Sequence, residues 1–313
     1  MLETFFATLS PMLVMFICIL IGFLLNKAKL APANSAAVLS KLETYVLLPA
    51  LIVHTFVNYC TVESIRGQYS LILFGVLGVA VSIVAGTILA RFFSRDPYQR
   101  SIYRYGLMSA NFGFLGNAIV PQILGDAALY PYMLFTLPLS AMVYGWCIQT
   151  LIPKGEKRGS TLKNLMNPTF IAMLIGILLG LLNVGKIMPS FLSSTISSLS
   201  GCMGPVAMIL TGFVIGDYDF VGLLKLPKVY VATILRLIVL PVLFIAVFWL
   251  LGADETVLVM SLFAFGTPLG LNTVVIPAAY GGDTKIGAAM AMISQVACII
   301  SIPLLYALLE TFL

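Results

Sequence analysis

The chain has 313 residues, of which 60% are hydrophobic and only 9% are charged, and its mean hydropathy is +1.07. A soluble domain carries about 25% charged residues, so this composition indicates a polytopic membrane protein without a soluble catalytic domain. The net charge of +5 resides in short loops and does not suggest nucleic-acid binding. The five cysteines are scattered singly, without metal-binding spacing, so we expect no metal site.

Ten apolar segments follow one another along the chain, each near the length of about 20 residues that a helix needs to cross a bilayer. The sequence therefore predicts an all-α fold with ten transmembrane helices. These span residues 4–26, 37–58, 69–92, 99–124, 128–152, 167–184, 189–216, 229–251, 255–281 and 286–309. The fourth, seventh and ninth segments carry the Gly and Pro residues that can interrupt a helix.

The loops between these segments are asymmetric in charge. When sides are assigned alternately, fourteen of the seventeen basic residues fall on one side, which the positive-inside rule makes cytoplasmic. Both termini are then extracytoplasmic, and we expect a multi-pass protein of the plasma (inner) membrane. The fourteen residues are Lys27, Lys29, Lys41, Arg91, Arg95, Arg100, Arg104, Lys154, Lys157, Arg158, Lys163, Lys225, Lys228 and Lys285.

The two halves of the chain repeat at a common offset of 155–157 residues. Pro11 matches Pro168, and Pro49 matches Pro205. Five spans per repeat is an odd number, so the second copy must insert upside down, which is a recurrent plan of secondary transporters. The predicted divisions are a first inverted repeat at 1–152, a cytoplasmic linker at 153–166 and a second inverted repeat at 167–313.

Two of the hydrophobic segments are interrupted at matching places, in residues 109–126 and 263–283. Asparagine, glycine and proline weaken a helix there, at what should be membrane depth. Such a pair points to the binding site of a secondary transporter. Ordinary kinking is the alternative, because Gly and Pro are common in membrane helices. The candidate substrate-binding residues are Asn111, Gly113, Gly116, Asn117, Pro121, Pro268, Gly270, Asn272 and Pro277.

A helix broken at mid-membrane exposes unpaired backbone groups, which are tolerated only inside protein or beside a water-filled cavity. The second half of each broken helix presents N–H groups and a partial positive charge, which favour a carboxylate or similar small anion. The carbonyl ends of the first halves can instead hold a cation. A cation or proton antiporter normally uses intramembrane carboxylates, and the acidic residues, Glu43 among them, fall near the predicted span ends. The balance favours an anion.

Four other polar residues within spans each allow two interpretations. His54 is a possible proton carrier, although we favour a neutral histidine bonded to backbone near the outer interface. Arg236 either pairs with the substrate or, as we favour, snorkels to the cytoplasmic surface. Ser294 and Gln295 either reach the crossing or bond across helices, and we include Gln295 among the candidate substrate contacts.

Several motifs of the chain resemble the auxin efflux carrier family in its bacterial branch, which includes malonate and malate permeases. Pro49 and His54 are also similar to the P-x-L-x-x-H pattern of the plant PIN carriers. The long hydrophilic central loop of many plant members is absent. The motifs that carry the resemblance are LLPALIV (47–53), SANFGFLGNAIVPQILGD (109–126), NPTFIAMLIGILLG (167–180), GPVAMILTGFVIGD (204–217) and TPLGLNTVVIP (267–277).

The resemblance implies a ten-span fold with crossed broken helices four and nine, shared with bile-acid symporters and sodium–proton antiporters. Segments 1, 2, 6 and 7 would form a scaffold, often dimeric, and segments 3–5 and 8–10 a moving transport unit. The crossed segments would bind the substrate anion at Asn117, Pro121, Asn272 and Pro277.

Together these inferences predict a transporter, not an enzyme. It would move a small organic anion, a mono- or dicarboxylate such as malate or malonate, by elevator-type alternating access. A sodium-coupled symporter of amphipathic anions is the alternative on the same fold. A membrane-embedded enzyme or sensor would need clustered His, Asp or Cys at depth, which the sequence lacks. The expected partners are the anion, the bilayer and a second copy of the chain through the scaffold helices. The coupling ion, H⁺ or Na⁺, stays open, and no other cofactor is expected.

Overall fold

A computed structural model describes residues 1–32, 34–153, 155 and 166–313 of the chain. Most of the predicted linker 153–166 lies outside the described residues, together with its basic side chains Lys154, Lys157, Arg158 and Lys163. Across the described residues the fold is helical, and the strand-like exception is an isolated antiparallel bridge between Ala110 and Leu269.

Among the described residues, seven helical segments are long and apolar enough to cross a membrane, which confirms the prediction of a polytopic α-helical membrane protein. The unbroken ones are α1 (Leu2–Lys27), α5 (Tyr69–Phe93), α11 (Ser190–Gly216) and α17 (Lys285–Phe312). The second span comprises α2 (Ser35–Leu42), the π-helical η1 (Glu43–Leu47) and α3 (Leu48–Tyr59). Another comprises η3 (Asp126–Ala128), α8 (Leu129–Met142), η4 (Val143–Cys147) and η5 (Ile148–Leu151). The last comprises α13 (Pro227–Ile234), η7 (Leu235–Val239) and α14 (Leu240–Leu250).

The other three predicted spans contain shorter helices, so the count of ten spans stays a prediction. The fourth is divided into α6 (Pro97–Met108), the π-helical η2 (Phe112–Gly116) and α7 (Asn117–Leu124). The sixth is α10 (Pro168–Leu181), and the ninth is divided into α15 (Glu255–Phe265) and α16 (Asn272–Ala279). The seventh, α11, is continuous in spite of Pro205. Short helices α4 (Val62–Gly67) and α12 (Phe220–Leu224) and the 3₁₀ turn η6 (Val184–Lys186) connect spans.

Polar caps fix where three of these shorter helices begin. The side chains of Asp96, Asn167 and Asp254 accept the backbone N–H three residues further on, at the starts of α6, α10 and α15. Pro97 and Pro168 occupy the first helical position, where a missing N–H costs nothing. Local sequence therefore determines these helix starts before any tertiary packing.

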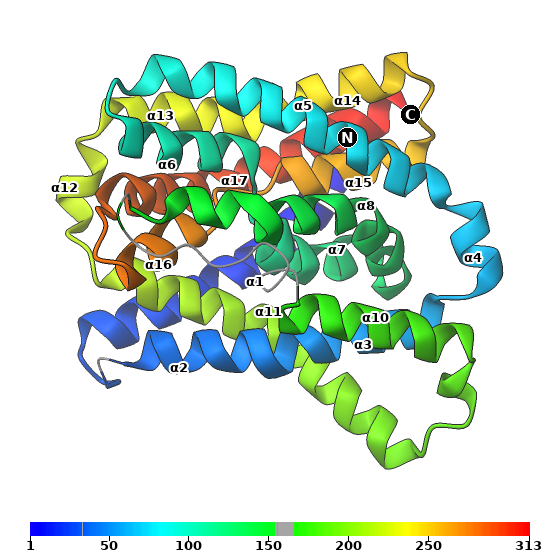
Figure 1. The fold of residues 1–313 in the computed structure, drawn as a ribbon. Helices are drawn as coiled ribbons and strands as arrows, with labels where there is room; N and C mark the ends of the chain where they lie inside the picture. The colour runs from blue at the N-terminus through cyan, green and yellow to red at the C-terminus, as the bar shows by residue number, and fades with distance from the viewer. Residues whose placement is uncertain (33, 154, 156–165) are drawn as a thin grey trace.

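The helices form two groups with the interrupted segments between them (Figure 1). On the lower side of the view, α3 packs against α10 and α11, and α1 packs against α11. On the upper side, α5 packs against α6 and α8, and α14 packs against α15. The α1–α11 contact is close because a side chain at Gly22 or Gly212 would collide with the opposite backbone, a use of small residues typical of membrane helices.

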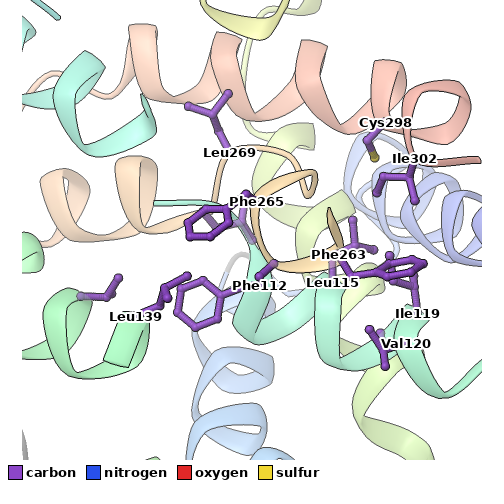
Figure 2. Close-up of a cluster of buried hydrophobic side chains, with 14 of the residues drawn as sticks. Phe112, Leu115, Ile119, Val120, Leu139, Phe263, Phe265, Leu269, Cys298 and Ile302 are labelled. Atoms are coloured by element: carbon purple, nitrogen blue, oxygen red, sulfur yellow. The ribbon is translucent and has the colours of Figure 1, made fainter. Parts of the chain in front are cut away.

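Apolar side chains from the two interrupted segments share one buried core (Figure 2). Phe112 and Leu115 of η2 face Phe263 and Phe265 of α15, and α17 closes the cluster with Ile302 among others. These five side chains are at most 6% exposed. Burial on this scale holds the two interruptions at a fixed position relative to each other.

Candidate functional site

The first interruption separates α6 from η2. Ser109, which follows Met108 at the end of α6, is extended, with φ −120° and ψ 125°. Asn111 precedes η2 with φ −82° and ψ 42°, and its carbonyl accepts the N–H of Gly116 at 3.1 Å. The chain thus leaves one helix and begins another within three residues. Backbone groups at both helix ends are left without hydrogen-bond partners within their helix.

The second interruption separates α15 from α16 over residues 266–271. Leu269 donates its N–H to Ser294 Oγ of α17 at 3.0 Å. Thr273 Oγ1 donates to the carbonyl of Gly270 at 3.0 Å, and both Ser294 and Thr273 are fully buried. Of the two interpretations of Ser294, this contact favours the one in which it reaches the crossing, because Leu269 lies within the second interruption.

The two interruptions touch each other. Ala110 pairs with Leu269 in an antiparallel bridge, and the N–H of Asn111 donates to the carbonyl of Pro268 at 2.7 Å. Nearby, Asn272 Nδ2 donates to the Tyr105 hydroxyl at 2.8 Å, which ties the start of α16 to the end of α6. Two helix N-termini, those of η2 and α16, therefore lie on either side of one short stretch of paired backbone.

A cavity opens at this contact, between the interruptions and helices α3, α8 and α10. The predicted site residues that line it are Asn111, Gly113, Asn117, Gly270 and Asn272. Other lining residues were not expected from the sequence: the polar ones are Ser109, Thr136, Ser140, Tyr144 and Thr169, and the apolar ones include Leu48, Ile52, Phe56, Phe170 and Met173. The cavity is therefore amphipathic, with asparagine amides and hydroxyl groups interspersed among apolar side chains.

Asn117 and Asn272 each keep polar groups that are free to bind a ligand. Asn117 Nδ2 donates to the carbonyl of Gly113 at 2.8 Å, and its Oδ1 is buried without a hydrogen-bond partner. Asn272 uses one amide N–H on Tyr105, as described above. Because a primary amide has two N–H donors and a carbonyl, each side chain has at least one polar group left for a molecule in the cavity.

Five predicted site residues lie elsewhere: Gly116, Pro121, Pro268, Pro277 and Gln295 do not line this cavity. Pro268 contributes its carbonyl to the contact of the interruptions. Pro277 is buried within α16, and Pro121 faces a second cavity. Gln295 is buried, and its Nε2 lies 4.0 Å from Met208 Sδ of α11. These positions shape the site without facing it.

Gly116 serves the packing of the first interruption. A Cβ there would collide with the hydroxyl of Tyr132, which is buried and donates to the carbonyl of Phe112 at 3.0 Å. The absence of a side chain thus allows α8 to supply a donor to a carbonyl of η2.

Replacing Gly116 by alanine is expected to destabilise the folded protein by about 1–3 kcal/mol, because Tyr132 must move and lose its hydrogen bond. Thermal melting of the purified protein measures the effect. Gly201→Ala is the matched control, since no atom lies within 4 Å of the Cβ that it would add. Equal melting temperatures for both variants would contradict this role of Gly116.

Arg236 does not snorkel, and that expectation is wrong. The residue is 0% exposed, and its Nη1 donates to the carbonyl of Leu107 at 3.1 Å. That carbonyl belongs to the last turn of α6, directly before the first interruption. A cation is favoured at a helix C-terminus. Nε and Nη2 are buried without partners, so part of the positive charge is uncompensated.

Glu43 also corrects an expectation, that the acidic residues stay near span ends. It is 0% exposed and follows the eight residues of α2, which places it about 12 Å into its span at about 1.5 Å per residue. Both carboxylate oxygens lack a hydrogen-bond partner. Glu43 does not line the cavity at the interruptions, so it contributes no lining charge to that cavity.

His54 lies outside the cavity at the interruptions. It is half-buried and lines a second cavity among α3, α7 and α11, together with Gln122, Asp126 and Ser200. Its role as a proton carrier stays a prediction. Asn117 lines both cavities. Among the described residues, no group of three or more His, Cys, Asp or Glu side chains is placed to hold a metal ion.

Comparison with known families gives one finding. A family model described as membrane transport protein matches the chain over residues 7–160 and again over residues 158–306. No curated protein matches the chain in a sequence search.

Proposed function

Because this chain belongs to the membrane transport protein family, that of the auxin efflux carriers, we propose that it carries a small organic anion across the plasma (inner) membrane at the contact of its two interruptions. Its family consists of transporters rather than enzymes. Within that class, a mono- or dicarboxylate such as malate or malonate is the proposed substrate. The observation that carries the proposal is the cavity beside two helix N-termini joined by the Asn111–Pro268 hydrogen bond.

Charge supports an anion over a cation at this place. The N-terminal N–H groups of η2 and α16 are positive ends of backbone dipoles, and none of the described residues that line the cavity is acidic. Arg236 adds a buried positive charge beside the end of α6. Tyr144, Thr136 and Ser140 supply hydroxyl groups that suit the oxygens of a carboxylate.

The position of the cavity supports alternating access of the elevator type. One wall comes from α3 and α10, and the opposite wall from η2, α8 and the start of α16. We assign α1, α2–α3, α10 and α11 to a scaffold that also forms a homodimer, and the remaining spans to a transport unit. Ten spans, inverted repeats at 1–152 and 167–313 and extracytoplasmic termini belong to the same proposal. A motion of one wall past the other would expose the cavity to each side in turn.

A sodium-coupled symporter is the second candidate function, and one observation favours it. Asn117 Oδ1 is a buried oxygen without a donor, and the last carbonyls of α15 also point toward the interruptions. Oxygen ligands of this kind suit a cation. Uptake with and without a sodium gradient distinguishes a sodium-coupled symporter from a carrier that works without sodium.

Uptake of radiolabelled malate and malonate into proteoliposomes tests the proposal. Asn117→Ala and Asn272→Ala each remove a polar contact to a charged ligand, so we expect uptake to fall roughly tenfold or more. Asn58→Ala is the control, because Asn58 is exposed on α3 and donates to the carbonyl of His54 at 2.9 Å, away from the cavity. If both cavity variants transport as well as the control, the site is elsewhere.

A further inference from the structure

Glu43 is a buried acid that the proposed site does not use. It begins η1, the π-helical turn between α2 and α3. The residue is 0% exposed, and neither carboxylate oxygen has a hydrogen-bond partner. Single π-turns inside α-helices are frequent at functional positions.

No cation faces this carboxylate from the elements that pack closest to η1, which are α2, α3, α10 and α11. Within the described residues, α10 has no titratable side chain and α11 has only Cys202, which is exposed. Lys41 of α2 and Tyr45 of η1 are exposed, and His54 and Tyr59 lie further along α3. Glu43 therefore has no counter-charge in this conformation.

An ionised carboxylate without partners in a membrane interior is far costlier than the neutral acid. The described conformation thus requires Glu43 to hold a proton. To release it, the carboxylate must reach water or a cation, and that requires a rearrangement of the elements that cover it. Proton binding at Glu43 and this conformation therefore stabilise each other, as linkage demands.

The buried face of this helix leads from Glu43 toward the second cavity. Leu47, Leu51 and Thr55 follow Glu43 at four-residue intervals and are all buried. Leu51 and Thr55 also line the second cavity, the one that contains His54. The acid therefore lies about two to three helical turns from a polar cavity.

We propose that Glu43 is a proton-binding site within the scaffold of this carrier: its carboxyl group holds a proton in the described conformation and releases it to water when the packing of η1 against α11, both scaffold elements, loosens. The proposal rests on the proposed transport function. It deepens that function, because the protonation state of Glu43 sets the conformation of the scaffold against which the transport unit moves.

The pH dependence of transport tests the coupling. In the wild type, anion exchange is expected to change by about fivefold or more between about pH 5.5 and about pH 8.5, because ionisation of Glu43 redistributes the conformations. Glu43→Gln mimics the neutral acid and is expected to keep activity while reducing that change to about twofold or less. Glu63→Gln, at an exposed position of α4, should retain the wild-type profile. Identical profiles for Glu43→Gln and the wild type would overturn the proposal.

A second measurement does not depend on any substrate. The folded protein holds a proton at Glu43. In the unfolded chain, Glu43 releases that proton once the pH exceeds the ordinary pKa of a glutamate side chain. The wild type is therefore expected to lose melting temperature relative to Glu43→Gln as the pH rises. A constant difference between the two proteins across pH would refute protonation of Glu43. If this difference appears and no carboxylate is transported, the proton site stands and the proposed substrate class fails.

Discussion

Replacing Arg236 by methionine is expected to weaken transport of organic anions by roughly tenfold or more, mainly through a higher KM. Two unit charges about 10 Å apart interact with about 1.7 kcal/mol at an effective dielectric constant of about 20, which is more than tenfold in affinity. Arg236 supplies a buried positive charge beside the last turn of α6, where Nη1 donates to the carbonyl of Leu107. Uptake of malate or malonate over a range of concentrations measures KM and the maximal rate separately.

Stability separates this electrostatic role from a structural one. Nε and Nη2 of Arg236 are buried without partners, and an apolar side chain of similar size removes that desolvation cost. Arg236→Met is therefore expected to melt at the wild-type temperature or above it, while its affinity for anions falls. Arg236→Lys keeps the charge and should lie between the two proteins in KM. Loss of both stability and transport in the methionine variant would instead make Arg236 a structural residue.

The sequence was sufficient to predict where the two interruptions lie, because their signals are local. Gly and Pro weaken a helix wherever they occur, and Asn111, Asn117 and Asn272 mark polar positions within apolar segments. Five of the predicted residues line the cavity for that reason. The caps at Asp96, Asn167 and Asp254 are equally local, and they determine the starts of α6, α10 and α15.

The cavity-lining residues of α8 and η4 left no such signal in the sequence. Thr136, Ser140 and Tyr144 lie on α8 and η4, in a segment that is apolar on its lipid side and on its protein side alike. Hydrophobic periodicity, which separates core from surface in a soluble helix, is faint under those conditions. Only tertiary packing reveals which side chains of such a span face the cavity.

The burial of two charged residues, Arg236 and Glu43, was also not predicted from the sequence. Glu43 was expected near a span end, and Arg236, well inside its span, was expected to snorkel to the cytoplasmic surface. The π-helical turns η1 and η7, which contain them, and the packing of α11 against η1 and of α17 against η7 determine their exposure instead. A single sequence does not specify these contacts, because each depends on residues more than forty positions away.

Replacing Gly113 by leucine is expected to reduce transport at least about tenfold while leaving the fold intact. Gly113 lines the cavity at the interruptions, and no atom lies within 4 Å of the position that a Cβ would take. A leucine side chain would therefore enter open space, where it occupies volume that a dicarboxylate needs. Helix propensity favours leucine over glycine by up to about 1 kcal/mol, so the melting temperature should not fall.

Graded substitutions and a matched control make this steric argument testable. Gly113→Ala adds one methyl group and is expected to impair a larger carboxylate more than a smaller one, whereas Gly113→Leu excludes both. Gly67→Leu is the control, because Gly67 is exposed at the end of α4 and also has no atom within 4 Å of an added Cβ. Normal uptake by Gly113→Leu would mean that anions do not pass through this cavity, since a side chain that fills it cannot leave a substrate bound there unaffected.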